Sequence, residues 1–160
     1  MCSRVYSEFY NNYWGLDVFQ LNEDSSKVMI EDVTAKNNEF EGMYLTGTGI
    51  TVNNANIRNG KYGLVIGGNV ENEITLAGDI TVTNNKYGFS TTFYAQGTVY
   101  VTGNLISNRN EKVGLGTYSA DLTIAVGGSY SGKSGKSGSG SITACENTLD
   151  INNVGGTNFE

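Results

Sequence analysis

Apolar and polar residues alternate in short runs along most of this chain. Period-two alternation over a few residues predicts strands with one buried face, and no stretch shows the 3.6-residue period of an amphipathic helix. We therefore predict an all-β protein. The clearest apolar pairs recur every 22 to 25 residues, at Val28/Ile30, Ile50/Val52, Ile74/Leu76, Val99/Val101 and Leu122/Ile124. Their intervening outward residues would form the column Met29, Thr51, Thr75, Tyr100 and Thr123.

Two further sets of apolar pairs repeat in step with the first. One set contains Val33/Ala35, Ala55/Ile57, Ile80/Val82 and then Leu105 or Ile106. The other contains Leu16/Val18, Met43/Leu45, Leu64/Ile66, Phe89/Thr91 and Leu115/Thr117. Three short strands per repeat, joined by turns, describe one coil of a parallel β-solenoid whose inward residues stack from coil to coil. We predict five to six coils, spaced about 4.8 Å apart.

The phrase N-x-x-x-G recurs in the predicted turns. Glycine and asparagine tolerate the left-handed backbone conformation, and the chain has 22 glycines and no proline. We therefore interpret the asparagine as the turn residue and the glycine as the point where the chain re-enters a strand. The matches are Asn11/Gly15, Asn38/Gly42, Asn59/Gly63, Asn84/Gly88 and Asn110/Gly114, with the glycines 27, 21, 25 and 26 residues apart.

The stretch ITVTNNKYGF, residues 80–89, resembles the repeat of right-handed parallel β-helix proteins. These include pectate-lyase-like enzymes, viral tailspikes and bacterial or algal surface proteins. The resemblance extends over about residues 4–126 and implies a right-handed, single-stranded β-helix with three short strands per coil. Because such folds host lyases, hydrolases, epimerases, adhesins and structural rods, the resemblance implies a fold and leaves the activity open.

The chain divides into three regions on composition. Residues 1–126 carry the repeat, residues 127–140 form a Gly/Ser/Lys-rich loop, and residues 141–160 regain some alternation. We interpret the last region as an irregular final coil, with a disordered tail as the alternative. The first residues already supply a strand in mid-coil, without a preceding capping helix. We therefore expect a fragment of a longer solenoid or an end covered by a partner, with self-association through solenoid ends as one outcome.

Net charge limits the expected partners. The formal charge is -6, which argues against nucleic-acid binding, and no apolar run approaches the roughly 20 residues needed to cross a membrane. The chain shows no signal peptide, and the resemblance implies an extracellular or cell-surface location. Cys2 and Cys145 would lie near opposite ends of a rod, so we expect each to be free or paired outside this chain.

Candidate catalytic chemistry is sparse. The absence of histidine removes the Ser-His-Asp and Cys-His systems and histidine metal sites. Acidic pairs such as Glu39/Glu41 fall in predicted turns, where solvated edges are usual, and no predicted strand column stacks an acid with a base. Oxygen-rich turns suggest a weak calcium site at Glu23, Asp24 and Asp32. No other cofactor is expected.

Basic and aromatic residues cluster near the repeat glycines. Lys61, Lys86 and Lys112 each stand two residues before a glycine, with Arg58 and Arg109 nearby. They form either a basic stripe that meets an anionic polysaccharide or solvated charges that protect a turn. The aromatic residues Trp14, Phe40, Tyr62 and Tyr87 lie at the same corner. Because Tyr62 shares parity with the inward Leu64, we expect an internal aromatic stack rather than a sugar-binding surface.

The sequence thus favours a non-catalytic module of a larger extracellular or surface protein. Its role would be that of a rigid spacer or a carbohydrate-contacting surface. One alternative is a fragment of a polysaccharide lyase, epimerase or hydrolase whose catalytic groups lie elsewhere. A second alternative is a segment of an oligomeric, tailspike-like fibre.

Overall fold

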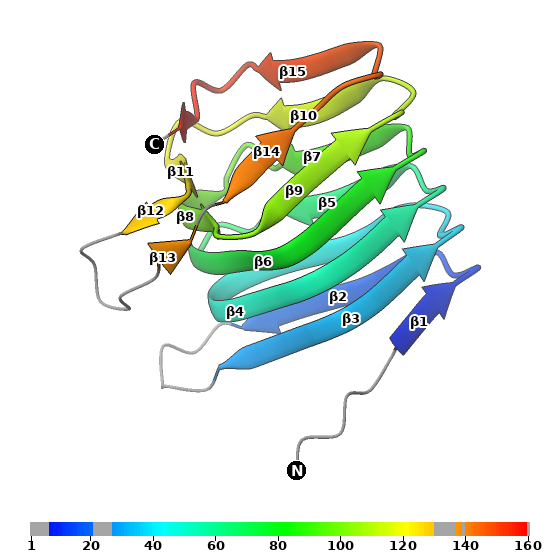
Figure 1. Ribbon diagram of the computed structural model, residues 1–160, viewed down its shortest axis with the longest axis horizontal. Helices are drawn as coiled ribbons and strands as arrows, with labels where there is room; N and C mark the ends of the chain where they lie inside the picture. Colours follow the sequence, from blue (N-terminus) through cyan, green and yellow to red (C-terminus); the bar gives the residue numbers. More distant parts are fainter. Residues whose placement is uncertain (1–6, 21–26, 130–136, 139, 160) are drawn as a thin grey trace.

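The protein is a parallel β-solenoid of about five coils (Figure 1). The computed structural model describes residues 7–20, 27–129, 137–138 and 140–159, and their regular structure is entirely β-strand. Each long strand pairs in parallel with its equivalent in the next coil, so a continuous 14-stranded sheet winds around one core. This arrangement confirms the predicted all-β solenoid. Cys2, Glu23 and Asp24 lie outside the described residues.

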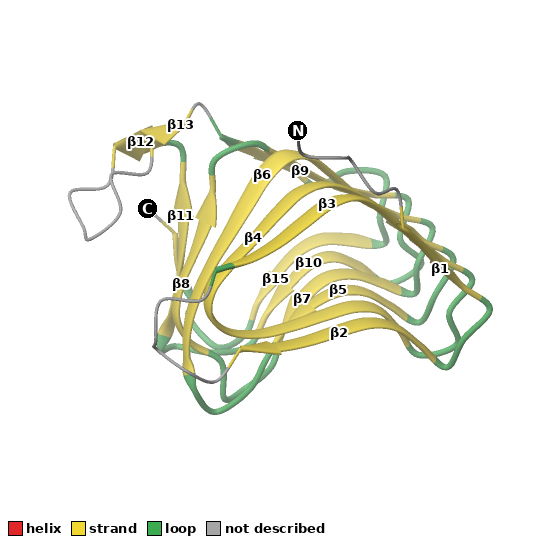
Figure 2. Ribbon diagram, turned by 90° about the horizontal axis from the view of Figure 1, so that it is seen from below, coloured by secondary structure: helices red, strands yellow, loops and turns green. Residues whose placement is uncertain are grey.

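Strands on one side of the rod form what we call the front wall (Figure 2). It contains β2 (Trp14–Gln20), the first part of β4 (Glu41–Arg58), β5 (Tyr62–Ile66), β7 (Tyr87–Thr91), β10 (Val113–Thr117) and β15 (Leu149–Asn153). Each strand follows a repeat corner, so this wall carries the residues that the sequence places just after the N-x-x-x-G phrase.

The remaining strands of the 14-stranded sheet form the back wall. It contains β1 (Ser7–Tyr10), β3 (Val28–Lys36), the second part of β4, β6 (Glu71–Thr83), β8 (Gln96–Val101), β9 (Asn104–Asn108), β11 (Leu122–Val126), β14 (Ser141–Thr143) and β16 (Asn158–Phe159). The strands β14, β15 and β16 pair with β9, β10 and β11, which stacks residues 141–159 on the preceding coil. A separate antiparallel pair joins β12 (Gly128–Ser129) to β13 (Ser137–Gly138).

Strand β4 passes from the front wall to the back wall without interruption. Its residues 41–47 pair with β2, and its residues 48–58 pair with β6. The bend between these parts contains Gly47 and Gly49, whose φ angles are 114° and 70°. Such positive values suit glycine, because other residues meet a steric penalty there. The backbone N–H of Gly47 also donates a hydrogen bond of 2.9 Å to the Asn72 side chain in the next coil.

Like residues stack on like residues in the core. On the front wall, Met43, Leu64, Phe89 and Leu115 occupy successive coils, and each is at most 1% exposed. On the back wall, Ile50, Ile74, Val99 and Ile124 do the same. Burying each such side chain contributes about 1.5–3 kcal/mol. Since a coil exposes its inward residues unless a neighbour covers them, the repeats stabilise one another.

The register of β11 differs from the one that residue spacing predicts. The structure aligns Ile124 with Val99, whereas the spacing aligns Leu122 with Val99. Consequently Ala125 lies beside Tyr100 in the outward column, and Thr123 pairs with Thr98. Leu122, Ile124 and Val126 are all apolar, so a shift by two residues keeps every side chain on its face. Alternation therefore cannot choose between these registers. In the preceding back-wall strand, Leu105 aligns with Ile80, which resolves the choice between Leu105 and Ile106.

The turn before each front-wall strand holds two different asparagine positions. The first takes the left-handed conformation, with φ between 55° and 60°, and is filled by Asn11, Asn37, Asn59, Asn84, Arg109 and Glu146. The next residue points inward and is a buried asparagine at positions 38, 85 and 110. The asparagines that the sequence aligns therefore fall into two structural positions. The left-handed residue stands five positions before the glycine at Asn37 and Arg109, and four positions before it in the other turns that precede a repeat glycine. Asn11, Asn59 and Asn84 are left-handed residues, whereas Asn38 and Asn110 are inward residues.

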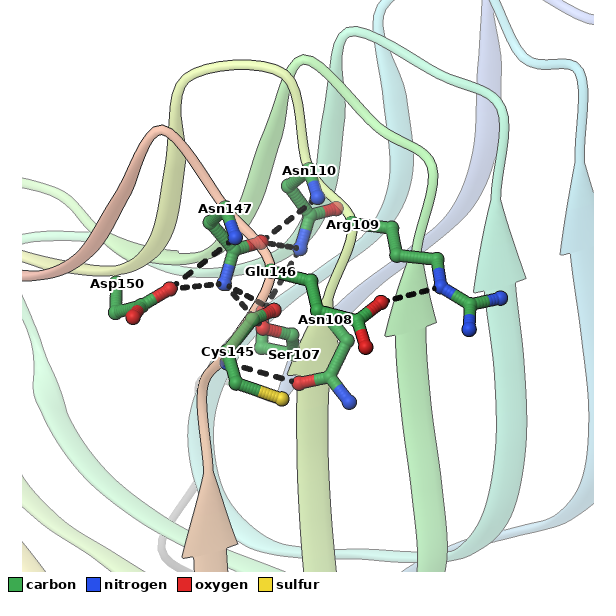
Figure 3. A network of polar contacts seen from close by, with 8 residues as sticks. All are labelled: Ser107, Asn108, Arg109, Asn110, Cys145, Glu146, Asn147 and Asp150. Atoms are coloured by element: carbon green, nitrogen blue, oxygen red, sulfur yellow. Dashed lines mark hydrogen bonds and ion pairs between the residues drawn. The ribbon is translucent and has the colours of Figure 1, made fainter.

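The inward asparagines form a hydrogen-bonded ladder between coils (Figure 3). Asn110 donates from its side-chain amide to Val82 O at 3.2 Å and to Asn147 Oδ1 at 3.1 Å. The same Asn147 oxygen accepts the backbone N–H of Asn110 at 2.7 Å. Buried backbone N–H and C=O groups require hydrogen-bond partners. These side-chain amides supply partners to the backbone groups of the turns that strand pairing does not reach.

The repeat glycines are required by close packing. Gly15, Gly42, Gly63, Gly88 and Gly114 have no positive φ angle, so the left-handed conformation does not explain them. A Cβ atom at Gly88 would lie 2.2 Å from Ser107 Oγ, 2.4 Å from Gly114 O and 2.6 Å from Asn110 Nδ2. The glycine column thus makes room for the asparagine ladder and for the backbone of the next coil.

Candidate ligand-binding groove

A groove of about 480 Å³ lies on the outer face of the front wall. This volume falls in the range typical of small-ligand sites, about 300–1,000 Å³. Phe40, Tyr62 and Tyr87 line it at the corner where the front-wall strands begin, and Phe93 and Tyr118 line it beyond the ends of β7 and β10. The lining between them includes Glu41, Val65, Ser90, Thr91 and Thr92.

The aromatic residues lie outside the core because strand alternation breaks at the glycines. A Cβ atom at Gly63 would lie 2.2 Å from the Val82 side chain, which belongs to the core, and the following Leu64 is also fully buried. Two consecutive residues therefore face inward, and the preceding Tyr62 faces outward. The expectation of an internal aromatic stack was wrong for this reason, since it assumed unbroken period-two alternation.

The rings at this corner form two stacked pairs. Tyr13 and Phe40 stack with centroids 5.6 Å apart and planes inclined by 3°, while Tyr62 and Tyr87 stack at 5.0 Å and 16°. The pairs meet edge to face between Phe40 and Tyr62, at 5.3 Å and 70°. Such contacts contribute about 0.5–1.5 kcal/mol each beyond surface burial. They hold a row of rings along four successive coils.

Trp14 extends this row at its first coil. Its ring lies nearly perpendicular to that of Tyr13, at 87°, with centroids 4.6 Å apart. Trp14 is 53% exposed and Tyr13 is 49% exposed. Because the other rings use much of their faces on one another, Trp14 offers a large aromatic surface to solvent.

The three predicted lysines are brought together on successive coils. Tyr87 N–H donates to Lys61 O, and Lys112 N–H donates to Lys86 O, both at 2.8 Å. All three side chains are exposed. The Lys61 ammonium lies 4.7 Å from the Phe40 ring centroid and 5.4 Å from that of Tyr62, which is within cation–π range. Lys112 lies 3.6 Å from the Glu111 carboxylate, so the stripe is partly neutralised.

The two predicted arginines lie apart from the groove. Arg58 ends β4 on the back wall and is exposed. Arg109 occupies a left-handed turn position, with φ of 56°, and pairs with Glu146 at 2.7 Å (Figure 3). The ion pair between Arg109 and Glu146 connects the turns of neighbouring coils, so we assign Arg109 a structural role in the turn.

Glu41 is a groove residue that sequence reasoning missed. It begins β4 and lies in register between Trp14 of β2 and Tyr62 of β5. Burial, together with the negative charge of Asp17, raises the pKa of Glu41 to about 7. Burial also raises the pKa of Asp17. The sequence grouped Glu41 with Glu39 as a solvated turn pair, and Glu39 is indeed exposed. The signal available was the position of Glu41 directly before a repeat glycine, where the neighbouring coils carry aromatic residues.

The proposed calcium ligands can be placed only in part, because Glu23 and Asp24 lie outside the described residues. Asp32 takes a left-handed conformation within β3, and its carboxylate accepts a 3.0 Å hydrogen bond from the Asn54 side chain. It lines a smaller hollow of about 250 Å³ with Asn54 and Asp79. Over the residues that the structure describes, no group of three or more acidic, cysteine or histidine side chains could hold a metal ion.

Known proteins add no functional assignment. Comparison with models of protein families, with curated proteins and with solved structures finds no match to this chain. Within its described part, the protein has no helix long and apolar enough to cross a membrane. The solenoid and the aromatic groove are therefore the observations on which a functional proposal rests.

Proposed function

We propose that this protein is a non-catalytic β-solenoid module that binds a polysaccharide in its aromatic groove. The observation that carries the proposal is the 480 Å³ groove, which combines tyrosine and phenylalanine rings with serine and threonine side chains. Sugar rings present both apolar C–H faces and hydroxyl groups. Aromatic rings match the first, and hydroxyl side chains match the second.

The stacking of coils favours a linear polymer as the ligand. Neighbouring coils are spaced about 4.8 Å apart. The ring centroids of Tyr13, Phe40, Tyr62 and Tyr87 follow at 5.6, 5.3 and 5.0 Å. A polymer lying along the rod would meet one of these rings at each of the four coils. Several weak contacts then act together, which raises the affinity above that of one sugar unit.

The proposed context is a larger extracellular or cell-surface protein with a right-handed β-helix. The resemblance of residues 80–89 to the pectate-lyase-like and tailspike-like repeat supports a β-helix of this kind, as does the parallel pairing of successive coils. A rigid rod of this kind also serves as a spacer. In this proposal, the spacer displays the groove along its length.

Binding to a glycan array, followed by calorimetry with the retained oligosaccharides, tests the proposal. Tyr62→Ala and Tyr87→Ala should each weaken binding about tenfold, which corresponds to about 1.4 kcal/mol. Tyr10→Ala provides a matched control, because Tyr10 is a 51% exposed back-wall aromatic residue whose ring also lies near a lysine, with Lys36 Nζ at 5.2 Å. Equal losses in all three variants, or no retained glycan, would contradict a sugar-binding groove.

An enzymatic role is the second candidate, and Glu41 is the observation that favours it. Carboxyl groups whose pKa is raised towards neutrality serve as general acids in glycoside hydrolysis, where a second carboxylate completes the site. Asp17 would be that second group. Incubation with each retained polysaccharide, with and without calcium, should yield neither new reducing ends nor unsaturated products if the module is non-catalytic. Product formation that Glu41→Gln abolishes would replace the binding proposal with an enzymatic one.

A fibre segment is the third candidate. The apolar side chains of β15 favour it, since Leu149 is 45% exposed and Ile151 is 56% exposed at one end of the rod. Sedimentation over a range of concentrations distinguishes a monomeric module from an oligomer formed through solenoid ends.

A further inference from the structure

Glu41 has a half-buried carboxylate without a compensating partner. Across the described residues, it forms neither a hydrogen bond nor an ion pair. Its surroundings raise the cost of its charge, because Trp14 and Tyr62 flank it in register and Asp17 adds a second negative charge. A charge in such a place is destabilising unless something binds it. The groove therefore has a position suited to a hydrogen-bond donor or a cation.

The rings around Glu41 already attract an ammonium group. Lys61 Nζ lies over both Phe40 and Tyr62, at 4.7 and 5.4 Å from their ring centroids. Aromatic faces combined with a carboxylate are the elements by which proteins recognise amines. This chemistry lies in the same groove that the proposed function assigns to sugar units.

We propose that the groove selects a polysaccharide that carries protonated amino groups, with an amine placed between Glu41 and the adjacent rings. This inference rests on the proposed function and specifies its ligand class. A polymer of amino sugars meets all three features of the site, because its rings meet aromatic side chains, its hydroxyls meet Ser90, and its amines meet Glu41. The net charge of -6 attracts the same class of polymer.

An anionic polysaccharide fits the groove less well. It would meet the negative charges of Glu41 and Asp17, and the Lys61 ammonium is the cation placed over the groove rings. Lys86 and Lys112 belong to the exposed turn edge, and Lys112 already has Glu111 as a neighbour. We therefore infer a role for the basic stripe other than capture of the main ligand.

Calorimetry with three oligosaccharides of equal length tests the inference: oligomers of glucosamine, of N-acetylglucosamine and of glucose. The wild-type protein should bind the glucosamine oligomer about tenfold more tightly than the two neutral oligomers. Glu41→Gln should remove this preference, so that the glucosamine oligomer binds about as tightly as the two neutral oligomers. Lys61→Gln should have the opposite effect and tighten binding of the glucosamine oligomer, because the Lys61 ammonium no longer competes for the Phe40 and Tyr62 rings.

The pH dependence gives an independent readout. A glucosamine oligomer with trimethylated amines keeps its charge at every pH, so any change with pH arises from the protein. The titratable groups that act on Glu41 are Asp17 on β2 and Tyr62 on β5, and the Lys61 ammonium lies over the neighbouring Phe40 and Tyr62 rings. Since the ligand favours the ionised carboxyl group, affinity should rise as pH increases through about 7 and then level off. Glu41→Gln should show a much smaller rise over this range.

The outcomes separate this inference from the proposed function. Equal affinity for charged and neutral oligomers would overturn the amine inference. If Tyr62→Ala still weakened binding, the proposal of a sugar-binding groove would stand. Binding of poly-lysine as tight as that of the glucosamine oligomer would also overturn it, because recognition would then require charge alone. Failure of every oligomer to bind would overturn both.

Discussion

The carboxylate of Asp150 accepts two hydrogen bonds from Asn147, one from its backbone N–H at 3.2 Å and one from its side-chain amide at 3.1 Å (Figure 3). Asp150 occupies the position that is glycine in the five preceding front-wall strands, since β15 aligns it with Gly114. In those strands, a side chain would collide with the next coil. The Asp150 side chain takes this space and ends the asparagine ladder.

Replacing Asp150 by alanine should loosen this end of the ladder. Asn147 would lose both of these hydrogen bonds, at a cost of about 1–2 kcal/mol, which is modest because Asp150 is exposed. Hydrogen exchange should show faster exchange at Asn147 N–H and little change at Asn85 N–H, which donates to Asn110. Uniformly faster exchange along the whole ladder would indicate that Asp150 contributes to global stability instead.

Gly88→Val should destabilise the protein far more than Thr75→Val. The new Cβ would meet the Gly114 carbonyl oxygen at 2.4 Å, so the coils must separate, at a cost of about 3 kcal/mol or more. Thr75 has a buried hydroxyl group without a hydrogen-bond partner in the described structure, and valine has nearly the same shape. Its replacement should change stability by about 0.5 kcal/mol or less, or increase it slightly. Equal shifts in urea midpoint would contradict the close-packing role of Gly88.

Glycine at position 84 should be tolerated, whereas glycine at position 85 should not. Asn84 has a φ of 55°, which glycine adopts without strain. Asn85 is 2% exposed, and its side chain bonds the backbone of Gly60, Ile57 and Thr83. We expect a change within about 0.5 kcal/mol for Asn84→Gly and a loss of about 3 kcal/mol or more for Asn85→Gly, by chemical denaturation. Similar losses at both sites would contradict the different roles that the structure gives these two positions.

Stability should depend on pH through Glu41. Its pKa is raised from the ordinary value of 4.5 to about 7, so the folded protein binds this proton more tightly than the unfolded chain. The resulting stabilisation is complete below about pH 4.5 and is lost as pH rises through about 7. Glu41→Gln removes this contribution, so the stability difference between the two proteins should change across that window. Urea unfolding at closely spaced pH values provides the measurement, and parallel curves would show that the Glu41 pKa is unperturbed.

Much of the fold could be predicted because each coil repeats the same physical requirement. The inward positions of Met43, Leu64 and Phe89 follow from period-two alternation, and their parallel pairing follows from the repeat length. The N-x-x-x-G phrase was harder to interpret, because it assigned Asn84 and Asn110 the same role in the turn. One is a left-handed residue and the other is a buried ladder residue. Both residues lie four positions before a glycine, so spacing alone cannot distinguish them.

The sequence by itself determined the strand-rich repeat, the inward faces and the corners at which the chain turns. Only the tertiary structure decided the register of β11, the outward direction of Tyr62 and the place of Glu41 in the groove. The physical reason is the same in all three cases. Alternation determines whether a side chain points into or out of the core, and a shift by two residues leaves this unchanged. Register and local breaks in alternation depend on packing instead, as at Gly63, where a Cβ atom would lie 2.2 Å from the Val82 side chain.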